Sequence, residues 1–113
     1  MKDDYFVLVY KILSHLYACL KSGEDADMEY LMCGSRDFPV DERYWSYIFE
    51  HLLDDGYIEG MAKVRRIGCK AYSFKQTDGL RISPKGIEYV QENNMMRKAA
   101  RMLKTIKEIT PII

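Results

Sequence analysis

The chain has 113 residues, of which 48% are hydrophobic and 30% are charged, and its 17 basic and 17 acidic side chains cancel. This length and composition predict one globular domain with a real core and argue against a disordered chain, while the longest apolar run, residues 5–10, is too short to span a bilayer. Three widely spaced cysteines without a CxxC pair, and two histidines far from them, favour a reduced cytoplasmic setting and give little support to a zinc site.

Two helices are predicted in the first third of the chain. Asp4 can cap the first, which runs to about residue 21 and carries a wide apolar stripe toward the core. Asp27 can cap a short second helix over about residues 28–33. Phe38, in the turn that follows, is expected to fill the gap between the second and third helices.

The third predicted helix has the clearest pattern in the sequence. Asp41 can cap its start, and Val40 and Trp45 occupy the two positions of a hydrophobic staple. Its apolar residues share one face, and Gly56 can adopt the left-handed conformation that ends a helix. A helix in this position, after two others and before a basic hairpin, indicates a winged helix-turn-helix.

After the third helix the hydrophobic period changes to two, which predicts strands. Alternate residues of the first strand are expected on opposite faces, with Ile58, Gly60, Ala62 and Val64 on one and Glu59, Met61, Lys63 and Arg65 on the other. A return strand follows at residues 72–75. A turn at residues 76–79 then leads to a last short strand at residues 80–82.

Two further helices are predicted at the C-terminal end. Ser83 and Pro84 suit the cap and first position of one, and Asn94 is expected to cap the other, which runs to about residue 109. The last helix carries a heptad-like apolar seam of Met95, Ala99, Met102, Ile106 and Ile109, widened by Leu103.

Three helices already close the core of a small domain, so the seam on the last helix needs another surface. We expect a homodimer interface there, with packing back onto the first helix of the same chain as the alternative. The chain is accordingly divided into a winged-helix domain, residues 1–93, and a C-terminal helix, residues 94–113. The expected fold is α+β and mainly α, with a three-helix core, a β-hairpin wing and an added helix.

Several segments of the chain together resemble the YjcQ-like family. They are Tyr44-Trp45-Ser46-Tyr47-Ile48, Asp55-Gly56-Tyr57-Ile58, Leu80-Arg81-Ile82-Ser83-Pro84-Lys85-Gly86-Ile87-Glu88-Tyr89, Gln91-Glu92-Asn93 and Met95-Met96. The resemblance covers most of the chain from Asp27 onward. It implies a small intracellular winged-helix protein of bacterial, phage or prophage origin. It implies no enzyme activity or cofactor and carries over no functional site.

The zero net charge conceals a division between the two halves of the chain. Residues 1–60 hold five Lys or Arg and thirteen Asp or Glu, whereas residues 61–113 hold twelve and four. Such asymmetry indicates a partner for the basic half, for example nucleic acid, or attraction between the halves within one chain or across a dimer.

The third helix and the hairpin are the candidate DNA contacts, because a winged helix places them in a groove and along the backbone. With Trp45 inward, the helix is expected to direct Arg43 toward bases and Ser46 or Tyr47 toward phosphates. The predicted contacts of the wing are Lys63, Arg65, Arg66 and Lys70. On the helix, the outward carboxylates Glu50 and Asp54 oppose binding to phosphates.

Two functions follow, and neither is enzymatic. One is a DNA-binding regulator of phage or prophage type, and the other is an adaptor that binds protein through the acidic, aromatic third helix. The sequence contains no glycine-rich phosphate loop, no metal-ligand spacing and no nucleophile with a matching base, so we predict no catalytic residue, metal or cofactor.

Overall fold

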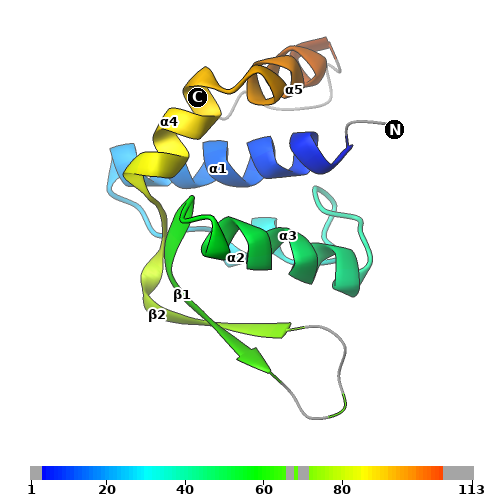
Figure 1. Ribbon diagram of the computed structural model, residues 1–113, viewed down its shortest axis with the longest axis vertical. Coiled ribbons are helices and arrows are strands. Elements are labelled where there is room, and N and C mark those ends of the chain that lie inside the picture. The colour runs from blue at the N-terminus through cyan, green and yellow to red at the C-terminus, as the bar shows by residue number, and fades with distance from the viewer. Residues whose placement is uncertain (1–3, 66–67, 69–71, 106–113) are drawn as a thin grey trace.

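The three helices of the body each begin at an acidic residue or directly after one. The computed structural model describes residues 4–65, 68 and 72–105, and these helices are α1 (Asp4–Ser22), α2 (Met28–Leu31) and α3 (Glu42–Asp54) (Figure 1). The Asp27 carboxylate accepts hydrogen bonds from two backbone N–H groups at 3.0 and 3.2 Å, and that of Asp41 accepts one from Arg43 at 2.9 Å. The predicted caps Asp27 and Asp41 are confirmed, because such bonds satisfy N–H groups that a helix leaves unpaired. The predicted cap Asp4 is wrong, because Asp4 is already the first helical residue of α1.

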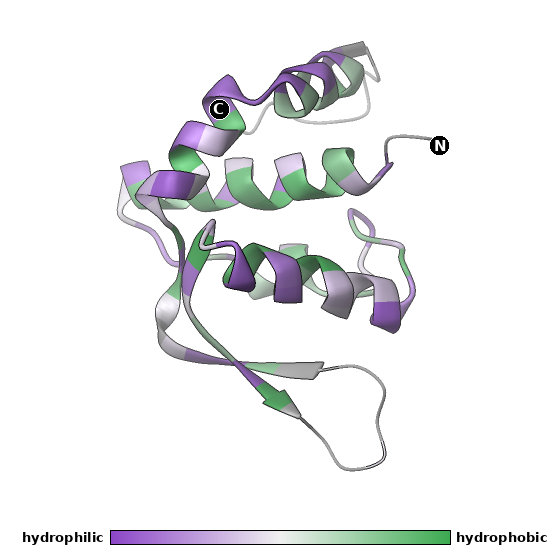
Figure 2. Ribbon diagram, viewed as in Figure 1, coloured by the Kyte–Doolittle hydropathy of each residue, from purple (hydrophilic) through white to green (hydrophobic). Residues whose placement is uncertain are grey.

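The core lies between α1, α3 and the hairpin. Green, apolar ribbon on α1 and α3 lies where the two helices approach each other (Figure 2). Phe38 is 1% exposed, and its ring meets that of Tyr30 edge-on at a centroid distance of 5.5 Å. Phe38 therefore fills the junction between α2 and α3, as predicted from its place in the turn.

The wing consists of two antiparallel strands, β1 (Ile58–Arg65) and β2 (Tyr72–Ile82). The predicted turn at residues 76–79 is wrong, because β2 continues through this segment. Glu59 pairs with Arg81 and Met61 pairs with Gln76, so a bulge takes up the extra residues of β2. Gly60 and Gly79 both have positive φ there, at 85° and 87°.

The bulge at Gly60 also corrects the predicted faces of β1. Ile58 and Met61 are both buried in the core, whereas Ala62 and Val64 are exposed. The pairing is irregular between Glu59 and Met61, and such a bulge shifts the alternation of side chains by one position. Residues before and after the bulge that were predicted to share a face therefore point to opposite sides of the hairpin. Met61 therefore contributes to the core, and the prediction that Ala62 and Val64 share a face with Ile58 is wrong.

The chain leaves β2 directly into α4 (Pro84–Glu92), which α5 (Asn94–Thr105) follows. The Ser83 hydroxyl accepts a hydrogen bond from Gly86 at 3.0 Å and caps α4 as predicted. For α5 the predicted cap is wrong by one residue. The Asn93 side chain accepts from two N–H groups of α5, at 2.9 and 3.3 Å, and Asn94 is already the first helical residue.

Helix α5 packs along α1 of its own chain, on the side of α1 opposite α3 (Figure 1). Met96, Ala99 and Leu103 are 0%, 1% and 6% exposed, and Ala99 and Leu103 share a buried cluster with Val7 of α1. The expectation that this stripe lies open for a second chain is therefore wrong for Ala99 and Leu103.

The remaining residues of the predicted seam divide into two groups. Met95 and Met102 are half-buried on α5, with Met102 packed at the edge of the Val7 cluster. Ile106 and Ile109 lie outside the described residues. A seam that uses Ala99 and Leu103 would first require α5 to leave α1, which would expose the apolar surface that it now buries.

Candidate nucleic-acid interface

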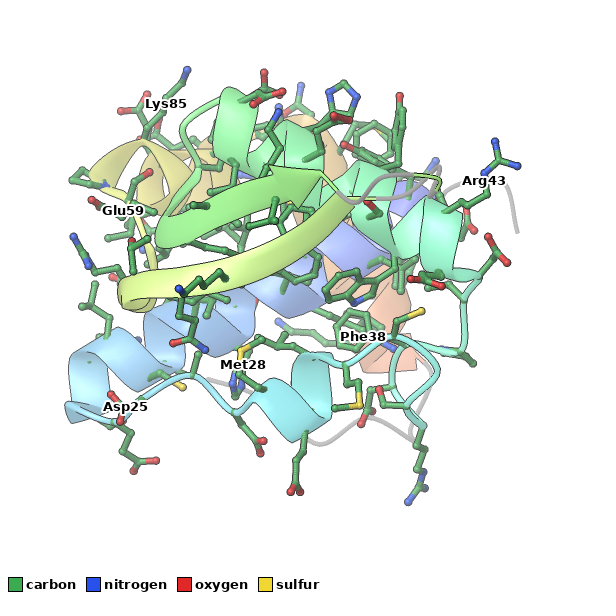
Figure 3. All side chains as sticks on the ribbon, turned by 90° about the horizontal axis from the view of Figure 1, so that it is seen from below. Asp25, Met28, Phe38, Arg43, Glu59 and Lys85 are labelled. Carbon is green, nitrogen blue, oxygen red and sulfur yellow. The ribbon has the colours of Figure 1, made fainter. Side chains whose placement is uncertain are left out.

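Arg43 and Tyr47 lie one turn apart on the solvent face of α3. Tyr47 is 52% exposed, and Arg43 extends into solvent at the start of the helix (Figure 3). These positions agree with the outward orientation expected for both residues. The N-terminal half of such a helix is the part that reaches base edges in DNA-binding proteins of this fold.

Ser46 does not belong to this face, and its predicted contact with a phosphate is wrong. Its side chain is buried, with 3% exposure. Phe49 and Leu53 lie three and seven residues further along the helix and pack into the core. Residues at these spacings share a helical face, so Ser46 lies on the inner edge of α3.

Lys63 of β1 reaches back to α3. Its Nζ atom lies 3.0 Å from the nearer carboxylate oxygen of Asp54 and 3.8 Å from that of Glu50. Its single positive charge therefore offsets part of the negative charge of the two carboxylates that were expected to repel DNA. Lys63 was predicted to contact a phosphate. In the structure its ammonium group is instead directed to the Asp54 and Glu50 carboxylates of its own chain.

Aromatic packing holds the base of the wing against α3. The Phe74 ring of β2 lies 5.6 Å from that of Trp45 and 5.9 Å from that of Phe49, measured between centroids. From this base, β1 runs toward the side of the molecule where α3 begins (Figure 1). The end of β1 and Arg43 therefore lie on the same side.

The basic residues of the wing are described only in part. Arg65 is the last residue of β1 and pairs with Tyr72 across the hairpin. Lys75 is exposed on β2. Arg66 and Lys70, both predicted DNA contacts, lie outside the described residues.

A group of tyrosines borders the other side of α3. The ring of Tyr5, from α1, lies 6.3 Å from that of Tyr47, and the Tyr44 hydroxyl donates a hydrogen bond to the Asp4 carboxylate at 3.3 Å. Burial, with smaller effects from neighbouring tyrosines and Asp55, raises the pKa of Tyr5 to about 12. Sequence reasoning missed Tyr5, because its partner is forty-two positions away in the chain.

A histidine and a cysteine meet on α1 away from this face. His15 Nε2 accepts a hydrogen bond from the Asp27 backbone N–H at 3.0 Å and lies 3.5 Å from Cys19 Sγ. Burial lowers the pKa of His15, and burial is also the largest cause that raises the pKa of the Cys19 thiol. A thiol that stays protonated is a poor nucleophile, so this pair has the geometry of a structural contact.

Within the described ranges, His, Cys, Asp and Glu form no group of three that could hold a metal ion. The helices found there are also too short or too polar to cross a bilayer.

Comparison with known proteins agrees with the resemblance seen in the sequence. The family model described as YjcQ protein matches residues 10–109, and so extends upstream of Asp27 into α1. No curated protein and no solved structure matches the chain.

Proposed function

The chain belongs to the YjcQ family, and we propose that it is a non-enzymatic winged-helix protein that binds duplex DNA, as a regulator of phage or prophage type. The observation that carries the proposal is the contact of Lys63 with Asp54 and Glu50. It joins wing and helix into one surface and reduces the negative charge that α3 would bring close to phosphates.

The contact also divides the roles on that surface. Exposed ion pairs add little to stability, so the pairing of Lys63 is understood better as positioning and charge neutralisation than as a source of folding energy. In this arrangement Arg43 contacts the bases, and Tyr47 contacts a phosphate. Backbone contacts along the wing fall to the basic residues beyond Lys63, namely Arg65, Arg66, Lys70 and Lys75.

A salt titration of binding to duplex DNA tests the proposal. The logarithm of the affinity should fall linearly with the logarithm of salt concentration, and Arg65→Ala with Arg66→Ala should reduce that slope by about 1 for each phosphate that is no longer neutralised. Arg43→Ala should instead weaken preference among sequences. Lys21→Ala, an exposed substitution at the far end of α1, is the matched control and should leave binding unchanged.

The protein adaptor is the second candidate, favoured by the tyrosines beside α3. Tyr47 is half exposed, and Tyr5, Tyr44 and His51 flank it on an acidic surface. Exposed aromatic residues of this kind serve as anchors in protein interfaces. Absence of DNA binding even at low salt would overturn the DNA proposal and leave this surface as the better candidate.

A further inference from the structure

A shallow cavity of about 270 Å³ opens beside α4, at the point where β1 begins. Tyr57 and Tyr89 form its aromatic wall, with ring centroids 4.3 Å apart and an interplanar angle of 24°. The exposed carboxylates Glu88 and Glu92 lie on its rim. The cavity is separate from α3 and from the wing end that the DNA proposal uses.

The chemistry of this cavity suits a cation with a planar, partly apolar side chain. Aromatic faces attract cations, and paired carboxylates accept the forked N–H groups of a guanidinium. Lys85 also lines the cavity, and its Nζ lies 5.3 Å from the centroid of the Tyr57 ring, so an incoming cation would have to displace this ammonium or bind beside it. Arginine fits such a site better than lysine, because its flat guanidinium can stack on a ring while it bonds to a carboxylate.

Helix α5 presents a matching surface immediately after α4 in the chain. Its inner residues, including Met96, are held against α1, so its outer face has a defined direction. The polar, purple side of α5 faces away from α1 (Figure 2). The exposed basic side chains of the helix are Arg97, Lys98, Arg101 and Lys104.

We propose that the α4 cavity receives an arginine of α5 from a second copy of the chain, in a two-fold symmetric dimer. Only Asn93 separates α4 from α5. A two-fold axis near this junction would bring each α4 onto the partner's α5 and form the same contact twice. The chain has no net charge and an acidic and a basic half, so two copies can associate without overall repulsion.

This dimer differs from the one expected from the heptad seam. It leaves Ala99 and Leu103 buried against α1 and uses the charged faces of α4 and α5 in place of apolar residues. It therefore requires no rearrangement of the fold, and its strength depends on salt.

Charge reversal tests the proposal by measuring mass in solution. Light scattering should give twice 13.3 kDa at low salt, with a Kd that rises steeply toward about 1 M salt, where screening is strong. Glu88→Lys with Glu92→Lys, and separately Arg97→Glu with Arg101→Glu, should each raise the Kd by at least about tenfold, because like charges then face each other. An equal mixture of the two variants should form a heterodimer, since both contacts become attractive again.

The matched control is Glu24→Lys with Asp25→Lys, which makes the same change in charge. Asp25 and Lys85 lie on opposite faces of the molecule (Figure 3), so this variant should dimerise nearly as well as the unmodified protein. Unchanged circular dichroism would show that each variant is folded. A monomeric unmodified protein, or a mixture of the two reversed variants that stays monomeric, would overturn the proposal.

Discussion

The indole Nε1 of Trp45 donates a hydrogen bond to the backbone carbonyl of Leu31, at 2.8 Å. Leu31 is the last residue of α2, a helix of only four residues. The final carbonyls of a helix have no partner within it, so Trp45 satisfies one of them and ties α3 to α2. The Trp45 ring also lies 5.6 Å from that of Phe74, measured between centroids, so this side chain joins α3 to both α2 and β2.

Replacement of Trp45 by phenylalanine should lower the free energy of unfolding by about 1–3 kcal/mol, because the buried Leu31 carbonyl loses its donor and the smaller ring packs less fully against its aromatic neighbours. Urea unfolding measures the change. Tyr47→Phe, on the exposed face of the same helix, should change stability by no more than about 0.5 kcal/mol. Equal effects of the two substitutions would contradict the role assigned to the indole N–H.

Gly60→Ala should damage the wing more than an ordinary glycine substitution. A Cβ atom at Gly60 would overlap the carbonyl oxygen of Gly79, and the φ of 85° is unfavourable for alanine in addition. The loss of stability should exceed the ~1–3 kcal/mol of backbone strain alone. Gly23→Ala is the matched comparison, since its φ is 76° and a Cβ there meets nothing within 4 Å. Thermal unfolding measures the loss of stability in each variant. The Gly23→Ala variant reports the strain alone, and any larger loss in Gly60→Ala reports the overlap with Gly79.

Met96→Ala tests the packing of α5 on the body of the molecule. Met96 is 0% exposed, so truncation should cost about 2–5 kcal/mol through reduced burial and a cavity. Met32→Ala, at a methionine that is 56% exposed, should be nearly neutral. If Met96→Ala were as mild as Met32→Ala, α5 would not be packed against its own chain in solution.

Stability should fall on acidification through His15. Burial lowers the pKa of folded His15 below its usual 6.5, with a smaller opposing effect of Asp27. The unfolded chain therefore binds the proton more readily, so the stabilisation is fully present above about pH 6.5 and is lost as pH falls through the folded pKa. Protonation of Nε2 would also remove the acceptor for the Asp27 N–H.

The measurement compares urea unfolding of the unmodified protein and of His15→Gln between about pH 8 and about pH 5. The difference between the two pH profiles isolates His15 from the carboxylates that titrate in both proteins. A parallel pair of profiles would show that His15 does not contribute to the acid sensitivity.

Helix starts were the most predictable part of this fold. Asp27, Asp41 and Ser83 each accept a hydrogen bond from an N–H group two or three residues further on. Such a bond is complete within one turn, so the residue type and its position are enough to find it. The exceptions are Asp4 and Asn94, which are the first helical residues of α1 and α5 and not their caps.

The candidate site was less predictable, because its errors arise where distant segments meet. Ser46 lies at the border between the two faces of α3, and the core decides to which face it belongs. Lys63 was recognised as a basic residue of the wing, but its partners Asp54 and Glu50 are on another element. Periodicity gives the direction of a side chain relative to its own helix or strand and carries no information on what lies opposite.

The sequence by itself determined the order of the helices and the place of the hairpin between the third and fourth, because caps and hydrophobic period act over a few neighbouring residues. The tertiary structure decided where α5 lies, how the bulge at Gly60 turns Met61 inward, and which carboxylates Lys63 contacts. These outcomes depend on which distant surfaces come together to bury apolar area and pair charges. An apolar stripe such as that of α5 shows only that burial is favourable, and α1 of the same chain proved to be the surface that provides it.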